Sequence, residues 1–397
     1  MIFRAKKRGK DDLKHNIILL GLVSFFNDMS SKMIEPILPM FLTVVGANPQ
    51  IIGIIGGLRD SISSLLKILA GYWSDRIGKR KPFVFLGYFS SSVFKFLIGI
   101  SRTTPLVFLF SSIERIGKGL RAAPRDAILA ESMPEHHGRG FGIHRFFDSL
   151  GAVLGAVIVF LLLWYLKWDY KVIIIVAALL GFLSLVPLSF VKEPKVKPKK
   201  ISFLTSLNSL PKSLKFFMLV ASIFAFSNIS YMFFILKVQD IFVDSFLKKT
   251  IPILFYILFN SFYASLAIVF GKLADRKSKP FVIIIGYLLF SLTTLGFAVS
   301  SKIMSFVILF ILYGISNAMI NSNQRALVAD LSRELEGTGL GTYHFIIGII
   351  AFFSSSIAGL LYSLNPSYAF YYSSILSLSA ALTFVMLRKK IISYSNN

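Results

Sequence analysis

The stretch "GYWSDRIGKRKPFVFLGY", from Gly71 to Tyr88, places one acidic and four basic residues between two apolar segments. A closely similar stretch, "GKLADRKSKPFVIIIGY", runs from Gly271 to Tyr287. A short basic segment between long apolar ones is typical of a turn at a membrane surface. Its recurrence in the second half of the chain indicates that a larger structural unit is present twice.

The composition indicates an all-α polytopic membrane protein. Of 397 residues, 55% are apolar and 16% are charged, whereas roughly a quarter of the residues in soluble domains are charged. Apolar runs of about 20 residues, enough to cross a bilayer core of about 30 Å, recur along the chain. The chain has no cysteine, which excludes disulfides and thiolate metal sites.

We expect twelve transmembrane helices in two pseudo-symmetric six-helix halves. The expected spans are residues 17–45, 51–74, 81–101, 105–131, 138–166, 170–191, 213–239, 250–274, 279–300, 304–330, 338–363 and 367–387. The longest hydrophilic break begins with "KEPKVKPKK". It divides the chain into an N-terminal half at 1–191, a linker at 192–212 and a C-terminal half at 213–397.

Further pairs of similar segments support the duplication. "RDAILAE" at 125–131 matches "RALVAD" at 325–330, and the glycines of "GRGFGIHR" at 138–145 recur in "GTGLGTYH" at 337–344. These matches keep the order and the offset of the two charged hairpins. Two related six-helix halves around a site at the membrane midplane are the construction of many secondary transporters.

The basic residues predict the orientation. The formal net charge is +24, and the bases gather in the breaks on one side of the expected spans, including the linker and both ends of the chain. Because cytoplasmic loops are rich in Lys and Arg, we expect both termini in the cytoplasm and the protein in the cell membrane. The bilayer, rather than nucleic acid, therefore accounts for the charge. No small-residue cleavage site follows the first apolar run, which we expect to be retained as a helix.

Two motifs resemble those of a known family. "GYWSDRIGKRK" at 71–81 resembles the loop between the second and third helices of the major facilitator superfamily, and "RIGKGLRAA" at 115–123 resembles its fourth-helix motif, with Lys118 where Gln is usual. The resemblance covers essentially the whole chain. It implies a secondary active transporter that moves a small-molecule substrate by alternating access, and it implies neither enzymatic activity nor a cofactor.

The chain departs from the family pattern in its fifth span. The antiporter motif Gly-x-x-x-Gly-Pro-x-x-Gly-Gly is kept at Gly151 and Gly155, but Ala156 replaces the proline and Val159-Phe160 replace the last glycines. This departure weakens the case for antiport.

The first hairpin predicts a gate formed by Gly71, Asp75, Arg76 and Gly78. Gly71 lacks a side chain at a point where its helix could approach a neighbour closely. The resemblance implies that Asp75 meets the N-terminus of the eleventh helix, where the helix dipole favours a carboxylate and would latch the outward-open state. The alternative is a hairpin that only anchors the chain through its bases.

Charged residues within the first span indicate a site. Asp28, Lys32 and Glu35 share one helical face, and Pro36 should kink or end the helix. A carboxyl group in a low-dielectric site can carry a proton, so Asp28 and Glu35 are the predicted proton sites. Alternatively, Asp28 and Lys32 form only a neutralising pair. The matching position in the second half lies near Asn228.

The fourth span holds the densest charge. Glu114 and Lys118 lie on one stripe with Arg121 and Arg125, and Arg115 lies beside it. Charges near the bilayer centre normally face a cavity or a partner. We expect Glu114, Arg115 and Lys118 to take part in the site, or else to form a static ion pair between helices. For Arg121 and Arg125, which lie nearer the cytoplasmic end, the sequence favours solvation.

Other polar residues within spans complete the predicted pathway. Asp148 shares a helical face with His144, for which solvation near the helix end is the simplest interpretation. Asn321 lies among amide residues that could bind a substrate or another helix. Lys95 could extend toward the membrane surface.

The sequence thus predicts a monomeric, proton-coupled secondary transporter. In its N-terminal half the intramembrane bases outnumber the acids, which favours an anionic or zwitterionic solute. Efflux of amphipathic compounds, favoured by the Phe-rich spans, and a non-transporting receptor or scaffold on the same fold remain alternatives. No phosphate-binding loop, nucleophile–base pair or metal-ligand cluster is apparent.

Overall fold

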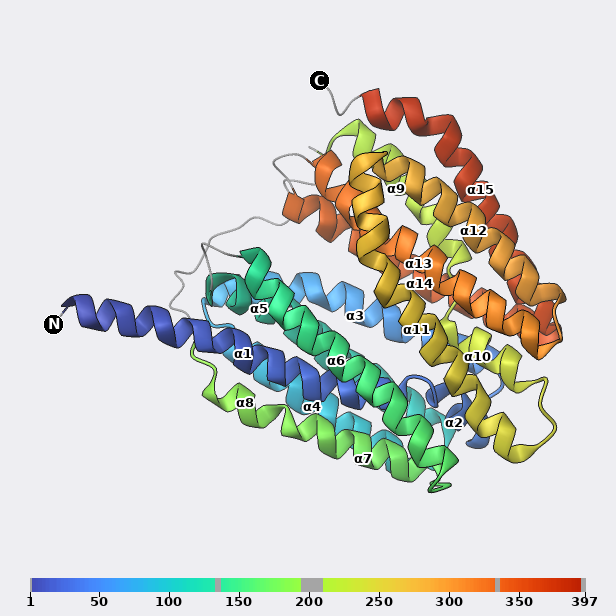
Figure 1. Cartoon of the computed structure of the whole chain (residues 1–397), viewed down its shortest axis with the longest axis horizontal. Coiled ribbons are helices and arrows are strands. Elements are labelled where there is room, and N and C mark those ends of the chain that lie inside the picture. Colours follow the sequence, from blue (N-terminus) through green and yellow to red (C-terminus); the bar gives the residue numbers. More distant parts are fainter. Residues whose placement is uncertain (1, 133–136, 194–209, 333–335, 394–397) are drawn as a thin grey trace. The chain divides into compact units, whose positions relative to one another are not determined.

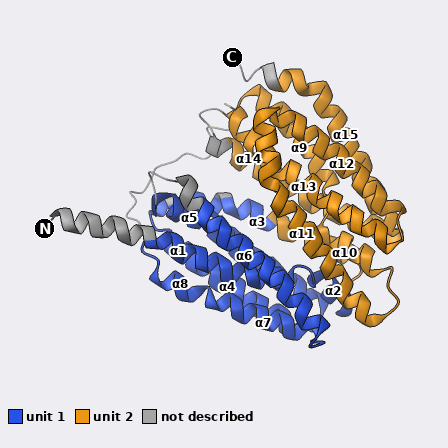
Figure 2. Ribbon diagram, in the orientation of Figure 1, with its two compact units in different colours: residues 1–46, 62–201 blue, residues 47–61, 202–397 orange. Residues whose placement is uncertain are grey.

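The structure is a computed structural model that describes residues 2–132, 137–193, 210–332 and 336–393 (Figure 1). Over these residues every regular element is an α-helix, which confirms the predicted all-α fold. The chain forms two compact units (Figure 2). Unit 1 comprises 1–46 and 62–201, and unit 2 comprises 47–61 and 202–397.

One helix, α3 (Pro49–Ile77), contributes to both units. The other helices of unit 1 are α1 (Ile2–Ile34), α2 (Leu38–Val44), α4 (Lys81–Ile100), α5 (Thr104–Ser132), α6 (His137–Trp164), α7 (Tyr170–Leu183) and α8 (Leu185–Phe190). The other helices of unit 2 are α9 (Lys212–Ser227), α10 (Tyr231–Gln239), α11 (Ser245–Arg276), α12 (Lys279–Val299), α13 (Ile303–Ser332), α14 (Glu336–Leu364) and α15 (Pro366–Ser393).

These helices make twelve passes over the described residues, as predicted. Ten segments are long and apolar enough to cross a membrane. Helices α3 and α5 supply the other two passes, and both carry several charged residues in their interiors. Three passes consist of two consecutive helices, namely α1 with α2, α7 with α8, and α9 with α10.

The first pass of each half is interrupted near its middle. Helix α1 ends at Ile34, directly before Glu35 and Pro36, which confirms the predicted effect of the proline. Helix α9 ends at Ser227, with Asn228 as its C-cap, and α10 begins at Tyr231. Interrupted helices at corresponding positions of two repeats are characteristic of the binding region in secondary transporters.

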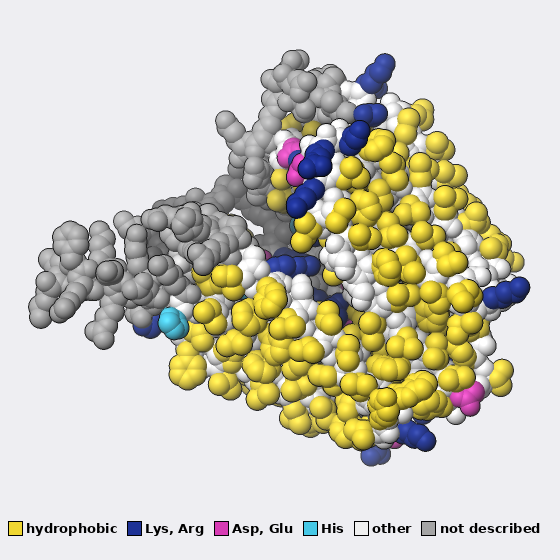
Figure 3. Space-filling view, viewed as in Figure 1, with side chains coloured by type: hydrophobic (Ala, Val, Ile, Leu, Met, Phe, Trp, Pro, Cys, Tyr) yellow, Lys and Arg dark blue, Asp and Glu magenta, His cyan; other side chains and the backbone are white. Residues whose placement is uncertain are grey.

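The outward faces of the helices are apolar. Large hydrophobic side chains such as Leu86, Phe146, Phe190, Ile268 and Met386 are exposed. In Figure 3 hydrophobic side chains cover most of the visible surface, and charged side chains are sparse there. Soluble proteins rarely expose such large apolar areas, so this surface suits contact with lipid acyl chains. The protein is a multi-pass membrane protein.

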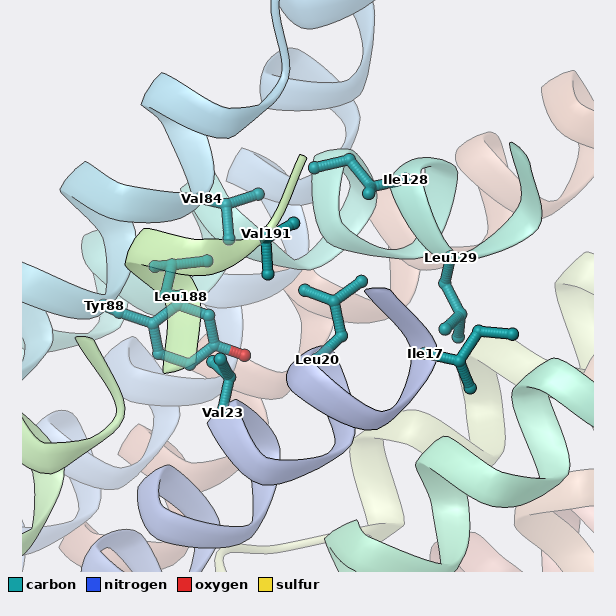
Figure 4. Close-up of a cluster of buried hydrophobic side chains, with 9 residues drawn as sticks. All are labelled: Ile17, Leu20, Val23, Val84, Tyr88, Ile128, Leu129, Leu188 and Val191. Atoms are coloured by element: carbon teal, nitrogen blue, oxygen red, sulfur yellow. The ribbon is translucent and has the colours of Figure 1, made fainter. Parts of the chain in front are cut away.

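One buried apolar cluster lies at the end of unit 1 next to the first charged hairpin. It contains Ile17, Leu20, Val23, Val84, Tyr88, Ile128, Leu129, Leu188 and Val191 (Figure 4). These side chains come from α1, α4, α5, α8 and the residue that follows α8. Their packing joins four helices of one unit and fixes the positions from which the polar side chains described below extend.

Candidate functional site

Glu35 lies at the break between α1 and α2 and is held by two bases. Lys32 Nζ donates to Glu35 Oε2 at 2.6 Å, and Arg115 Nη2 of α5 lies 3.5 Å from Glu35 Oε1. Glu35 is buried, so this pairing offsets the cost of removing its charge from water. Lys32 thus forms an ion pair with Glu35 and also interacts electrostatically with Asp28, so the alternative of a neutralising Asp28–Lys32 pair stays open.

Arg115 joins Glu35 to a second buried acid. Its Nε lies 3.1 Å from Oε2 of Glu114, and Ser91 of α4 donates to Oε1 of Glu114 at 3.1 Å. The structure therefore brings Lys32, Glu35, Arg115 and Glu114 into one ionic cluster. Glu114 and Arg115 are neighbours on α5, so their ion pair lies within one helix; the links to other segments are Arg115 with Glu35 and Ser91 with Glu114.

Lys118, one turn beyond Glu114 on α5, differs from the two bases of this cluster, Lys32 and Arg115. Its side chain is half-buried at the midpoint of α5. Across the part of the chain that the structure describes, it makes no hydrogen bond and no ion pair within 4.0 Å. Glu35, Asp28 and Glu114 are close enough to interact with it electrostatically. Its charge is therefore available to a bound group.

The expectation that Arg121 is solvated is wrong. Arg121 is buried, it donates to Asn27 Oδ1 at 3.1 Å and to the Gly87 carbonyl at 3.3 Å, and its guanidinium lies 4.4 Å from the centre of the Tyr88 ring. Helix periodicity shows which residues share a face of α5. It does not show that α1 and α4 cover the face that carries Arg121. Arg125 is half-buried and bonded to Asp126 at 2.8 Å.

Lys95 and His144 are also buried rather than directed to the membrane surface. Lys95 of α4 donates to Ser30 at 3.0 Å and to Ser31 at 2.8 Å, both on α1. His144 Nε2 of α6 lies 2.8 Å from Ser24 Oγ, also on α1. Small hydroxyl side chains on α1 are thus the partners of both groups; Ser24 and Ser31 lie near the charged stripe predicted for this span, and Ser30 was not predicted.

Asp148 of α6 meets Asp28 of α1. The two carboxyl groups lie within hydrogen-bonding reach of each other. Asn27 Nδ2 donates to Asp28 Oδ1 at 3.0 Å, and Arg145 Nη1 lies 3.0 Å from Asp148 Oδ2. The structure thus separates the two predicted proton sites, because Asp28 faces another acid and Glu35 faces two bases.

The predicted residue of unit 2, Asn321, belongs to a chain of amide groups on α13. Asn321 Nδ2 donates to Asn317 Oδ1 at 3.2 Å, and Asn317 donates to the Tyr313 carbonyl at 2.8 Å. Gln324 nearby links two rings, since it donates to Tyr287 at 2.5 Å and accepts from Tyr343 at 2.6 Å. Neutral hydrogen bonds therefore link these side chains of α13 to one another and to Tyr287 and Tyr343.

The first hairpin has the predicted close approach. A Cβ atom at Gly71 would lie 3.2 Å from the Cβ of Ala123, so α3 and α5 are in near contact there. Gly78 follows α3 with φ +71° and donates its N–H to the Ser74 carbonyl at 2.9 Å. Arg76 is exposed, and the side chain of Asp75 lies outside the described part. The gating role of these residues stays a prediction.

Equivalent ion pairs tie both hairpins to the helix that ends near them. Arg80 pairs with Glu131 at the end of α5 at 2.5 Å, and Lys279 pairs with Asp330 at the end of α13 at 2.5 Å. Glu131 and Asp330 close the matching segments "RDAILAE" and "RALVAD". In the first hairpin Glu193 also accepts the backbone N–H groups of Arg80 and Lys81.

No group of three or more His, Cys, Asp and Glu residues in the described ranges is arranged to hold a metal ion. The chemistry of the interior is that of paired acids and bases, hydroxyl groups and amides. Such an interior can exchange protons and bind a polar solute.

Comparison with known proteins agrees with this architecture. The Major Facilitator Superfamily model matches residues 20–260 and 247–393, which together cover nearly the whole chain. The chain belongs to the major facilitator superfamily. A relative from Methanocaldococcus jannaschii, an uncharacterized MFS-type transporter, is 47% identical over 375 residues, which are 94% of each chain.

Other proteins that the chain resembles are more distant. The multidrug resistance protein MdtH of Shigella dysenteriae is 31% identical over 181 residues, which are 45% of this chain and 42% of that protein. The crystal structure of the nucleoside transporter NupG superposes with a TM-score of 0.74 at 14% identity, over 96% of this chain and 99% of that one. These findings support a membrane transporter, and the structural likeness shows the fold alone.

Proposed function

We propose that this superfamily member is a proton-coupled carrier of a small anionic or zwitterionic solute. The observation that carries the proposal is the state of Lys118. Around it Glu35 is bonded to Lys32 and Arg115, and Glu114 is bonded to Arg115 and Ser91. Lys118 is left without an ion-pair partner among the described residues.

An unpaired ammonium group in the middle of a membrane pass is costly. Insertion measurements assign about 2.5–3.5 kcal/mol to a charge at the centre of a transmembrane helix. A water-filled cavity lowers this cost, and a bound anion would lower it further. A carboxylate or phosphate on the solute supplies such an anion, and an ammonium group on a zwitterion could contact the nearby acids.

A thermal-shift screen of the purified protein tests this proposal, because a ligand of the folded state raises its apparent stability. The compounds are carboxylates, amino acids, sugar phosphates and cationic amphipaths. We expect stabilisation by at least one anion or zwitterion, loss of that stabilisation in Lys118→Gln, and its retention in Lys302→Gln, which alters an exposed lysine. Stabilisation by cationic amphipaths only would contradict the proposal.

Efflux of amphipathic compounds is the second candidate. It is supported by the partial similarity to the multidrug resistance protein MdtH and by the aromatic interior of unit 2, where Phe234 stacks on Tyr313 at 4.2 Å. In the same screen this candidate predicts stabilisation by several unrelated amphipaths, with little effect of Lys118→Gln.

A further inference from the structure

Helices α1 and α6 approach each other closely along two glycines. A Cβ atom at Gly151 would lie 2.3 Å from the Phe25 carbonyl oxygen, and one at Gly155 would lie 2.3 Å from the Met29 carbonyl oxygen. Neither position can carry a side chain without moving a backbone. The two glycines that remain of the fifth-span motif therefore fix the register of α6 against α1.

This register places two acids against each other. Asp28 lies between Phe25 and Met29 in sequence, and Asp148 precedes Gly151 by less than one helical turn. Their carboxyl groups are within hydrogen-bonding reach, and both side chains are half-buried. Two carboxylates offer four acceptor oxygens and no donor, so a hydrogen bond between them requires a proton on one of the groups.

We infer that Asp28 and Asp148 form a carboxylic acid–carboxylate pair that shares one proton, and that this pair, rather than Glu35, is the proton-carrying group. Two carboxylates within hydrogen-bonding reach of each other do not both ionise readily, which is the principle behind the acid pair of aspartic proteases. The two groups titrate as a unit, so the proton belongs to the pair.

Charged and titratable groups surround the pair from two neighbouring helices, α4 and α5, as well as from its own two helices, α1 and α6. Those that interact with Asp28 or Asp148 are Lys32 on α1, Lys95 on α4, Lys118, Arg121 and Arg125 on α5, and His144 and Arg145 on α6. These bases stabilise one negative charge on the pair. Either acid alone, facing these bases without the other, would remain ionised.

Glu35 has the opposite surroundings. It is bonded to Lys32 at 2.6 Å and faces Arg115 at 3.5 Å. Protonation of Glu35 would leave two bases in a buried site without their counter-charge. The ionic cluster around Glu35 therefore favours a permanently charged carboxylate.

The pair also suggests how a proton and a solute are coupled, and this part rests on the proposed function. Lys118 interacts electrostatically with Asp28. When the pair releases its proton to water, the O–H bond breaks and a second carboxylate remains to compete for Lys118. When the pair is protonated, Lys118 is free to bind an anionic group. Proton and anion binding then favour each other.

Infrared spectroscopy of the full-length protein in lipid vesicles tests the pair without any substrate. The measured signal is the C=O stretch of a protonated carboxyl group at neutral pH. We expect it in the unaltered protein, in Asp126→Asn, which removes a carboxyl group from α5, and in Glu35→Gln. We expect its loss in both Asp28→Asn and Asp148→Asn, because each change leaves a single ionised acid among bases.

Persistence of the signal in either Asn variant, its absence from the unaltered protein, or its loss in Glu35→Gln would overturn the inference. Circular dichroism verifies that each variant is folded. If an Asn variant does not fold, Asp28→Glu and Asp148→Glu are measured instead. A shift of the C=O band in both Glu variants supports the shared proton, and an unshifted band contradicts it. A positive infrared result together with a failed anion screen would disprove the proposed solute class and leave the pair intact.

Discussion

The interiors of the two units are built from different chemistry on the same helical plan. In unit 1, Arg115 pairs with Glu35 from another segment and with its neighbour Glu114 within α5. In unit 2, α13 presents amides, and Gln324 bonds to the hydroxyl groups of two tyrosines. When Arg125 is aligned with Arg325, Arg121 corresponds to Asn321, so a charge in one repeat is replaced by an amide in the other.

This difference shows what a duplicated membrane fold constrains and what it leaves open. Within a bilayer the helices satisfy their own backbone hydrogen bonds, so the fold survives a change in the chemistry of its interior side chains. The repeats keep the ion pair between hairpin and helix end, Arg80 with Glu131 and Lys279 with Asp330. Anchoring of the hairpins is common to both units, whereas the ionic cluster of Lys32, Glu35, Glu114 and Arg115 belongs to unit 1.

The largest expected effect concerns coupling to protons. Asp28→Asn and Asp148→Asn should each abolish accumulation driven by a pH gradient and preserve exchange, because exchange needs no net proton movement. The assay uses proteoliposomes and the anion found in the thermal-shift screen.

The matched change in unit 2, Asn321→Ala, should retain accumulation driven by the gradient, since an amide does not titrate. If both Asp variants still concentrate the solute as the unaltered protein does, the proton site lies elsewhere, with Glu114 as the next candidate. Loss of gradient-driven accumulation in Asn321→Ala alone would place the coupling residue in unit 2 rather than in unit 1.

The next effect concerns stability. Arg115→Met should lower the free energy of unfolding by about 3–5 kcal/mol, because it leaves Glu35 and Glu114 buried without a common partner. Asn317→Ala in unit 2 should cost only about 0.5–1.5 kcal/mol, the value of a neutral hydrogen bond. Denaturant-dependent unfolding in detergent measures both changes. Equal losses of unfolding free energy would show that breaking the ionic cluster costs no more than breaking the amide chain.

Breaking the ion pair of the first hairpin should also lower stability more than breaking that of the second. Arg80 is buried against Glu131, so Arg80→Ala should cost about 1.5–3 kcal/mol, the value of a hydrogen bond to a charged group. Lys279→Ala should cost less than about 1 kcal/mol, because Asp330 is half exposed and water screens the pair. The same unfolding assay measures both variants, and a larger loss for Lys279→Ala would contradict the difference in burial.

The smallest effect concerns the backbone of the hairpins. Gly78 adopts φ +71°, so Gly78→Ala should cost about 1–2 kcal/mol. Lys277, at the end of α11 in the second hairpin, has φ −96°, and Lys277→Ala should change stability by no more than about 0.5 kcal/mol. Unfolding midpoints measure the difference. An unchanged midpoint in Gly78→Ala would mean that the turn can relax to an ordinary conformation.

Much of the fold could be predicted from the sequence, because its determinants are local. Apolar length predicted twelve passes even though α3 and α5 are rich in charge. Pro36 predicted the break after α1, since a proline cannot complete helical hydrogen bonding. In the corresponding pass, α9 ends before Asn228 although no proline lies nearby in the sequence. Only the structure revealed this interruption.

The candidate site was predicted only as a set of residues. Spacing along one helix predicted Asp28, Lys32 and Glu35 on one face, and Glu114 and Lys118 on another, but α1 ends at Ile34, before Glu35. Spacing cannot show which residues of different helices meet. It therefore predicted solvation for Arg121 and His144, which the structure buries against Tyr88 and Ser24 respectively.

The sequence by itself determined the membrane environment, the number of passes, the duplication and the family, because hydrophobicity and motif spacing are properties of the chain. The tertiary structure alone decided which charges are partners. Lys32 pairs with Glu35, and Asp28 meets Asp148 across the glycine contact of α1 with α6. The energy of a buried charge depends on distances of a few ångströms between helices, and these distances follow from packing in three dimensions.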